Sequence, residues 1–197
     1  RQMCIRDRVK IPQYKGQILA AAASFIVVCG GISSYFVPAK YMSVDINPSV
    51  MMTINIYNRV INTKPLNDDA EILLSKTDVS GMSVSESMDE LIKKSEEIGY
   101  LNEHNKDVIV EVVDGIGKIK LPDKNYGDVE VIIENADKAD LKNAKEMGVS
   151  IAKARAIAEY TKQNGGSIEE NVHKLENQSV KELSLIHISE PTRLLSI

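Results

Sequence analysis

The stretch VDINPSV, residues 44–50, decides how the chain folds, because an Asn-Pro pair interrupts an alternating pattern there. On both sides of this pair, apolar and polar residues alternate with the period of two that is typical of half-buried strands. The apolar positions are Met42, Val44 and Ile46 before the pair and Met52 and Ile54 after it. Asn-Pro is a common turn opener. The stretch therefore predicts an antiparallel hairpin with Asn47 and Pro48 in its turn.

Periodicity and capping signals predict the elements that follow the hairpin. Further strands are expected at residues 59–67, 107–113 and 128–134, and helices at residues 68–76, 83–100, 137–147, 150–163 and after Ser167. Pro65 places the first of these strands at a sheet edge, and DVIVEVV at 107–113, apolar on both faces, indicates an inner strand. Ser83 and Glu86 form a capping box. This order predicts an α+β fold, a small mostly antiparallel sheet with helices packed on one face.

An apolar segment without any charged residue covers residues 16–39. Its roughly 20 apolar positions match one bilayer crossing, so we predict an N-terminal transmembrane helix at about 17–37. Lys10 and Lys15 precede this helix, which favours a cytoplasmic N-terminus and an extracytoplasmic C-terminal domain by the positive-inside rule. A cleaved signal peptide is the alternative, because VPA at 37–39 has small residues at the spacing of a cleavage site.

Both ends of the chain have an unusual composition. RQMCIRDR at 1–8 and the segment 184–197 resemble translated sequencing-adapter read-through, so we leave both out of the fold reasoning. The expected organisation is a cytoplasmic stub at 9–15, the transmembrane segment at 16–39 and one extracytoplasmic domain at 40–183. Without both ends the formal net charge moves from −4 to about −6, and this acidic balance argues against nucleic acid as a partner.

The usual residue patterns of metal, cofactor or Cys/His sites are missing from the sequence. Once the ends are set aside, Cys29 is the remaining cysteine, and it lies in the apolar segment. His104 falls in a polar loop and His173 on a terminal helix, so the spacing of a metal cluster is missing. GIG at 115–117 lacks the third glycine and the following helix of a dinucleotide-binding motif. We therefore expect no metal, no cofactor and no enzyme that acts on an external substrate.

The Asn47–Pro48 bond carries the one reaction that the sequence suggests. Since proline has no N–H, the backbone nitrogen after Asn47 cannot attack the asparagine side chain. The side-chain amide nitrogen of Asn47 can instead attack its own carbonyl carbon, which forms a succinimide and releases Pro48 as a new N-terminus. A fold that holds these two atoms about 3–3.5 Å apart supplies the near-attack geometry for this reaction. The alternative is a plain turn without any chemistry.

Three neighbouring polar residues are candidates for assisting such a cleavage. The tetrahedral oxygen needs a hydrogen-bond donor, and the proline nitrogen must be protonated before it leaves. Ser43 and Asp45 share the strand face of Asn47, so they are candidates for handling the proton. Ser49 is a candidate hydrogen-bond donor. It cannot be the nucleophile of an N-to-O shift, because that reaction uses the residue directly after the scissile bond, which here is Pro48.

The segment YMSVDINPSVMMTINIYNRVINTKPLND at 41–68, placed directly after the apolar segment, resembles the juxtamembrane segment of RsgI-type anti-sigma factors. These proteins are membrane regulators of sigma-I. The matching motifs are Asp45–Ser49, Ile54–Asn55, Asn58–Ile61, Pro65–Asn67, IGYL at 98–101, DVIVEVV at 107–113 and SVKEL at 179–183. The resemblance spans about 15–183 and is strongest at its start.

The resemblance implies a self-cleaving regulator. In that family a small cytoplasmic domain holds the sigma factor, one helix crosses the membrane, and the outer domain cleaves itself at the Asn-Pro bond. The cleavage residues of the family correspond to Asn47 and Pro48 of this chain. The two pieces stay joined through the sheet until an external signal, related to cell-wall or other polysaccharide, separates them. An intramembrane protease then frees the sigma factor.

The chain departs from the family pattern before the apolar segment, where residues 9–15 leave no room for a cytoplasmic anti-sigma domain. The C-terminal carbohydrate-binding or disordered extension of the family is missing as well. We therefore expect a truncated form of a longer protein, and sigma-factor binding is implied for the parent protein. The alternative function is a membrane-anchored extracytoplasmic interaction module in which Asn47–Pro48 is a turn and is never cleaved.

Overall fold

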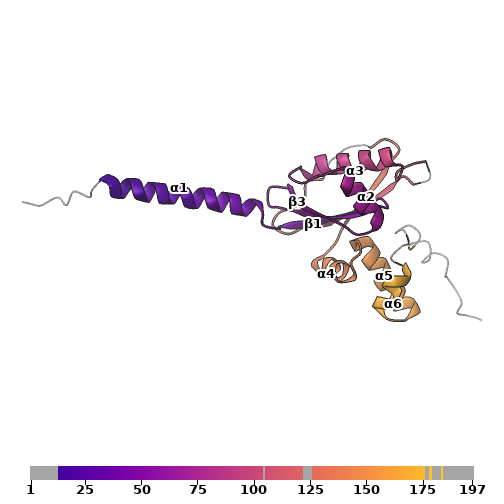
Figure 1. Cartoon of the computed structure of the whole chain (residues 1–197). Coiled ribbons are helices and arrows are strands. Elements are labelled where there is room, and N and C mark those ends of the chain that lie inside the picture. Colours follow the sequence, from indigo (N-terminus) through magenta and orange to yellow (C-terminus); the bar gives the residue numbers. More distant parts are fainter. Residues whose placement is uncertain (1–12, 104, 122–125, 176–177, 179–182, 184–197) are drawn as a thin grey trace, which may run out of the picture. The chain divides into compact units, whose positions relative to one another are not determined.

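The computed structural model describes residues 13–103, 105–121, 126–175, 178 and 183, with side chains from residue 20 onward. The segments 1–8 and 184–197 and His104 lie outside the described residues. The chain divides into two compact units, residues 1–36 and residues 37–197. Figure 1 shows the elements of both units coloured along the sequence, and each unit is described by itself below.

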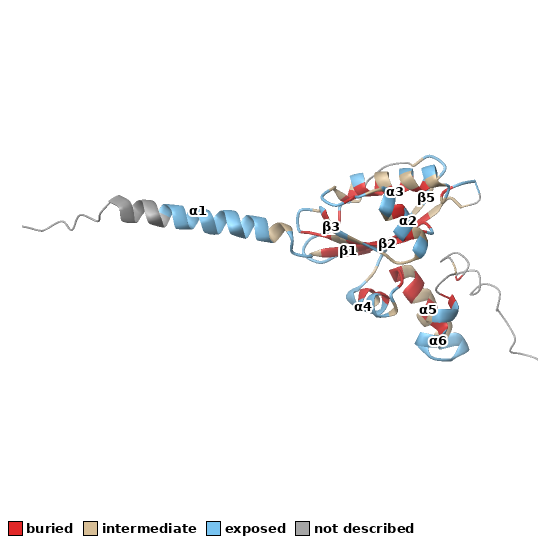
Figure 2. Ribbon diagram, in the orientation of Figure 1, coloured by how far each residue is buried: buried red, intermediate tan, exposed pale blue. Residues whose placement is uncertain are grey.

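The first unit contains one helix, α1 (Gln13–Tyr35). Large apolar side chains are exposed along this helix, as its pale blue colour in Figure 2 indicates. They are Phe25, Ile26, Val27, Val28 and Ile32. Within the part of the chain that the structure describes, no helix combines the length and the apolar character that a membrane crossing requires. The transmembrane helix at 17–37 therefore stays a prediction.

The second unit contains a five-stranded sheet in the order β3-β2-β1-β4-β5. Its strands are β1 (Lys40–Asp45), β2 (Ser49–Ile54), β3 (Val60–Pro65), β4 (Asp107–Val113) and β5 (Glu130–Asn135). The pairs β1–β2, β1–β4 and β2–β3 are antiparallel, and β4–β5 is parallel. The α+β class, the mostly antiparallel sheet, the edge position of the strand that ends at Pro65 and the inner position of β4 are confirmed.

Among the described residues of this unit, five helices accompany the sheet: α2 (Asp68–Lys76), α3 (Val84–Ile98), α4 (Lys138–Met147), α5 (Ile151–Asn164) and α6 (Ile168–Leu175). The capping box at the start of α3 is confirmed. The Ser83 hydroxyl accepts from the Glu86 backbone N–H at 3.3 Å, and the Glu86 carboxylate accepts from the Ser83 N–H at 2.8 Å. Two otherwise unpaired backbone donors are satisfied in this way, which fixes where α3 begins.

One face of the sheet packs against α2 and α3, as Figure 1 shows. Even-numbered residues of β1, β2 and β4 point into this core, because successive side chains of a strand alternate between the faces. The core includes Met42, Val44, Met52, Ile54, Val108 and Val110 from the strands and Leu73, Met88 and Leu91 from the helices. This core is the one that the alternating pattern around the Asn-Pro pair predicted.

The prediction that helices pack on one face of the sheet is wrong, because α4, α5 and α6 cover the other face. Their apolar residues form a second core with Met51 and Val113 of the strands. The helical members of this core are Leu141, Ala144, Ile151, Ala154, Ile157 and Leu175. The polar residues of β1 on this face, Ser43 and Asp45, are therefore buried instead of solvated.

Candidate functional site

The Asn-Pro pair lies in a tight turn between two paired strands. Asp45 of β1 pairs with Ser49 of β2, so the loop consists of Ile46, Asn47 and Pro48. The Ile46 N–H donates to the Pro48 carbonyl at 2.8 Å and closes the loop. Asn47 is exposed and Pro48 is buried. The predicted hairpin is therefore present, with regular strand pairing on both sides of the loop.

The backbone of Asn47 is left-handed, with a φ of 56°. Asparagine tolerates this region better than most residues, but a residue before proline prefers φ near about −120°, because the proline ring clashes with its backbone. Residues held in sparsely populated backbone regions store about 1–3 kcal/mol. The Asn47–Pro48 peptide bond is thus flanked by a strained residue that the paired strands hold in place.

Two asparagines from distant parts of the chain hold this loop. Asn105 donates from Nδ2 to the carbonyl of Ile46 at 2.9 Å and to the carbonyl of Tyr100 at 3.0 Å. Asn67 donates from Nδ2 to the Asn47 side-chain oxygen Oδ1 at 3.4 Å. Asn47 is therefore fixed through the backbone of its neighbour Ile46 on one side and through its own side chain on the other.

Asn67 also caps a helix and contacts the strand after the loop. Its Oδ1 accepts from the Ala70 N–H at 3.0 Å, which caps the N-terminus of α2, and from the Ser49 N–H at 3.1 Å. In addition, the Leu66 N–H donates to the Ser49 carbonyl at 3.0 Å. The junction between β3 and α2 is thereby tied to the loop by side-chain and backbone hydrogen bonds.

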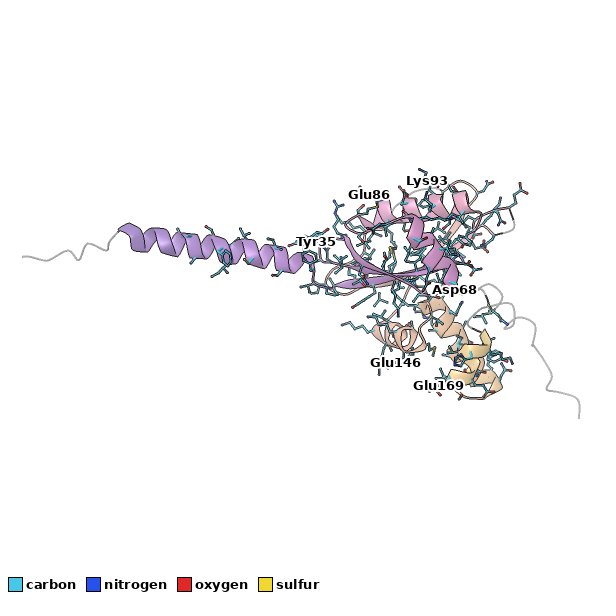
Figure 3. All side chains as sticks on the ribbon, in the orientation of Figure 1. Tyr35, Asp68, Glu86, Lys93, Glu146 and Glu169 are labelled. Carbon is cyan, nitrogen blue, oxygen red and sulfur yellow. The ribbon has the colours of Figure 1, made fainter. Side chains whose placement is uncertain are left out.

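A polar pocket of about 540 Å³ opens beside Asn47. Its wall combines the start of α2 with the connection between α4 and α5. The lining residues include Asn67, Asp68, Asp69, Met147, Gly148 and Lys153. Figure 3 labels Asp68, which marks the α2 side of this pocket. The exposed Asn47 therefore borders a polar pocket that is open to solvent.

Asp45 lies at the base of the loop and is buried. Burial raises the pKa of its carboxyl, while the Ser49 and Ser150 hydroxyls and the Lys153 ammonium group lower it by a smaller amount. Within the described residues, neither Asp45 oxygen accepts a hydrogen bond of good geometry, although both hydroxyls lie close enough to affect its pKa. A carboxyl in this position favours the protonated form more than a solvated one does.

A second buried carboxyl lies next to Asp45 across the β1–β4 pairing. Glu111 is fully buried and accepts from the Ser43 hydroxyl at 3.0 Å. Burial and, to a lesser degree, the charge of Asp45 raise the pKa of Glu111 to about 7, against the lowering effect of Ser43 and Arg155. Two acidic groups that both resist ionisation thus lie beneath the loop, on the face covered by α5.

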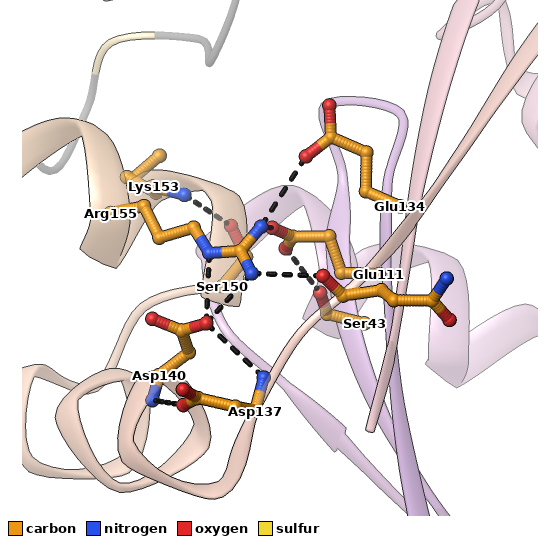
Figure 4. A network of polar contacts seen from close by, with 9 residues as sticks. Ser43, Glu111, Glu134, Asp137, Asp140, Ser150, Lys153 and Arg155 are labelled. Atoms are coloured by element: carbon orange, nitrogen blue, oxygen red, sulfur yellow. Dashed lines mark hydrogen bonds and ion pairs between the residues drawn. The ribbon is translucent and has the colours of Figure 1, made fainter. Parts of the chain in front are cut away.

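Arg155 of α5 connects this pair to the surrounding elements, as Figure 4 shows. Its guanidinium contacts Glu111 at 3.4 Å, Glu134 at 3.3 Å and Asp140 at 2.7 Å. It also donates to the carbonyl of Asn135 at 3.0 Å. One cation therefore ties β4, β5 and α4 to α5, and this contact offsets part of the cost of burying Glu111.

The family model for the anti-sigma factor RsgI-like central domain matches residues 39–159 of this chain. The chain belongs to this family. The match begins just before β1 and ends in α5, so it includes the hairpin, Asn67 and the buried carboxyl pair. The resemblance that the sequence motifs indicated is thereby confirmed.

Several anti-sigma-I factors of Acetivibrio thermocellus are similar to this RsgI-like chain. RsgI7 is 28% identical over 159 residues, which is 72% of this chain and 29% of that protein. RsgI6 is 30% identical over 100 residues, 47% of this chain and 13% of that protein. RsgI5 is 39% identical over 70 residues, 36% of this chain and 15% of that protein. The chain thus matches less than a third of the length of each of these relatives.

The RsgI-like fold distributes the predicted site residues over two positions. Asn47, Pro48, Ser49 and Asp45 lie together at the end of the hairpin. Ser43 lies two residues before Asp45 on β1 and donates to Glu111, so its hydroxyl is directed at a carboxylate and not at the loop. Ser49 remains beside Asp45, where its hydroxyl lowers the pKa of that carboxyl.

Sequence reasoning missed four polar residues of this RsgI-like site, namely Asn67, Asn105, Glu111 and Lys153. Asn67 carried one signal, since an asparagine directly before an acidic first turn is a typical helix N-cap. Among the described residues, no group of three or more His, Cys, Asp or Glu side chains could hold a metal ion.

Proposed function

We propose that this chain is part of a membrane-anchored anti-sigma factor whose extracytoplasmic domain cleaves itself between Asn47 and Pro48 and transmits an envelope signal that releases a sigma factor. One observation carries the proposal. Asn47 is held in a left-handed conformation directly before a proline, in a closed loop between two paired strands. The membership of the chain in the RsgI-like family supports the anti-sigma role.

The cleavage is an internal transfer that needs no water and no external reagent. The Asn47 Nδ2 forms a bond to the Asn47 carbonyl carbon, and the bond from that carbon to the Pro48 nitrogen breaks. Nδ2 loses one proton and the Pro48 nitrogen gains one, so atoms and charges balance. The strained loop raises the free energy of the starting state, and proximity replaces a bimolecular encounter.

Asp45, Ser43 and Ser49 are the proposed helpers of this reaction. Asp45 is buried at the base of the loop with a raised pKa, so it holds a proton more readily than a solvated carboxyl and can deliver it toward the leaving nitrogen. Ser49 lies beside Asp45 as its strand partner. Ser43 acts further away through Glu111, to which it donates.

The regulatory role follows from where the cut lies in the sheet. The N-terminal piece would end just after β1, which pairs with β2 on one side and with β4 on the other. The two pieces would therefore stay associated without a covalent link. Each molecule would cleave once, so the protein is a regulator and not a multiple-turnover enzyme.

The membrane part of the proposal rests on the charge-free apolar segment 16–39. We infer a single-pass anchor with a cytoplasmic N-terminus. A cytoplasmic domain of the whole protein would bind the sigma factor, an intramembrane protease would act on the separated N-terminal piece, and cell-wall polysaccharide is the proposed source of the signal.

Mass spectrometry of the denatured whole chain tests the cleavage. We expect two fragments, one beginning at Pro48, and we expect Asn47→Ala to remain a single intact species. Asn58→Ala is the matched control, because Asn58 is the second left-handed asparagine, with a φ of 57°, and has no proline after it. This control should cleave as the unchanged protein does. An intact species from folded unchanged protein refutes self-cleavage.

One observation favours the alternative of a non-cleaving, membrane-anchored interaction module. Asn47 is exposed, and asparagine adopts the left-handed region in many ordinary turns. In that case the polar pocket beside Asn47 would serve binding alone. The same mass measurement separates the two functions, since the module predicts one intact species with or without Asn47.

A further inference from the structure

The orientation of the Asn67 side chain follows from its hydrogen bonds. Its Oδ1 accepts from two backbone donors, the N–H groups of Ser49 and Ala70, at 3.1 and 3.0 Å. An amide with its oxygen on two donors must present its Nδ2 on the opposite side. That side faces Asn47, at 3.4 Å from the Asn47 Oδ1. Two fixed backbone donors thereby decide which end of Asn67 meets the residue before the scissile bond.

The same logic fixes the amide of Asn47. Because Asn67 Nδ2 is a donor, the atom of Asn47 that faces it has to be the acceptor Oδ1. The Nδ2 of Asn47 therefore lies at the other end of the amide group, away from Asn67. A flipped Asn47 amide would set two donors against each other. Without Asn67, both orientations of an exposed asparagine amide would be open to rotation.

We infer that Asn67 is a positioning residue for cleavage at Asn47–Pro48, which directs the Asn47 Nδ2 away from itself for attack and stabilises the Asn47 Oδ1 by hydrogen bonding. This inference rests on the proposed self-cleavage. When Nδ2 gives up a proton to become a nucleophile, the negative charge of the deprotonated amide is shared with Oδ1 of the same group. A donor at Oδ1 stabilises that charge before the attack moves it to the Asn47 carbonyl oxygen. Asn67 touches the reacting side chain but gives up no atom or proton.

Two variants separate positioning from the capping role of Asn67. Asn67→Asp keeps the shape and both accepting contacts, and aspartate is as good an N-cap as asparagine, but it removes the donor to Asn47. Asn67→Ser keeps a neutral N-cap oxygen with a shorter side chain. If Asn67 were merely structural, both variants would cleave at the original rate. We expect both variants to fold and to cleave at least about tenfold more slowly at neutral pH. This is the rate effect of losing one hydrogen bond to a charged group.

The pH profile supplies a second readout that a structural role would not change. When the introduced carboxyl of Asn67→Asp is protonated, it regains a donor, so its cleavage rate relative to the unchanged chain should recover as the pH falls. The neighbouring charged groups Asp45, Asp68, Asp69 and Lys153 are the same in both proteins, so the ratio of the two rates isolates the new group. Asn67→Ser has no such group and its ratio should stay constant with pH.

The experiment follows fragment formation by mass spectrometry from the whole chain in detergent, with folding checked by circular dichroism. Slow cleavage in both folded variants, with recovery at low pH in Asn67→Asp alone, supports the inference. Unchanged rates in the variants overturn it and leave self-cleavage standing. If the unchanged chain stays intact while folded, the proposed self-cleavage fails and the role of Asn67 fails with it.

Discussion

The buried acid Glu111 makes a strong prediction about the pH dependence of folding. Its side chain is fully buried and its pKa is raised from 4.5 to about 7 by burial first and by Asp45 second. A carboxyl whose pKa is higher in the folded state contributes stability below its unfolded value, and this contribution disappears as the pH rises through the folded value. Glu111 therefore destabilises the fold at neutral pH relative to acid.

The size of this effect follows from the shift. A change from 4.5 to about 7 corresponds to about 3 kcal/mol of unfolding free energy. In Glu111→Gln the side chain stays neutral, and its amide can still bond Ser43 and Arg155, which now contact Glu111 at 3.0 and 3.4 Å. At about pH 4, below the unfolded value of 4.5, the variant should resemble the parent, and at about pH 8 it should be more stable by about 3 kcal/mol.

Urea denaturation at several pH values measures the difference in unfolding free energy between Glu111→Gln and the parent. Both proteins carry Asn47→Ala, so that neither can cleave by the proposed route. Glu134→Gln is the matched control, since Glu134 contacts the same Arg155 at 3.3 Å but is half exposed. Its stability should run parallel to that of the parent over the whole range. A difference between Glu111→Gln and the parent that is constant from about pH 4 to about pH 8 would show that Glu111 ionises normally, and the reasoning would be refuted.

Two further predictions concern the ends of elements. In Gly115→Ala an added Cβ would overlap the backbone carbonyl oxygen of Ala39, which cannot rotate away, so we expect a loss of about 3 kcal/mol in urea denaturation. Unchanged stability would mean that the backbone of Gly115 does not approach Ala39 in this way. Ser83→Ala removes the acceptor for the Glu86 N–H and should cost about 1 kcal/mol and lower the thermal midpoint, whereas an unaltered midpoint would contradict the capping role.

Local signals in the sequence were sufficient to predict the first core and the hairpin. The period of two around Asn47–Pro48 matches the strands that pair Asp45 with Ser49, and the Ser83–Glu86 box lies at the start of α3. Such features depend on residues close in sequence, where propensity and hydrogen bonding act together. They can therefore be deduced from a single sequence.

The second face of the sheet could not be predicted in the same way. Ser43, Asp45 and Glu111 are polar, and polar residues at alternate strand positions usually indicate a solvated face. Here α5 covers them, with Arg155 satisfying part of the buried charge. An alternating pattern shows that one face of a strand is apolar and the other polar, but it does not show whether a later helix buries the polar face.

The contacts of Asn67 and Asn105 with the hairpin also lack a sequence signal. Asn105 lies in a loop far along the chain from Ile46, whose carbonyl it contacts. Asn67 is recognisable as a cap from the acidic residues after it, but its contact with Asn47 exists only because β3 brings α2 back to the end of β1 and β2. Tertiary hydrogen bonds between single polar residues leave no periodic pattern to read.

The burial of both sheet faces bears directly on what a cut at Asn47 would do. β1 lies between β2 and β4, so hydrogen bonds hold it along both edges. Pulling it out would also expose Met42 and Val44, at a cost of about 3–6 kcal/mol for these two side chains alone. An edge strand would have one ladder to break. A central strand that is covered on both faces would therefore keep the two pieces of a cut protein together. The pieces would separate only if β1, the strand that continues into the N-terminal segment, were pulled out of the sheet.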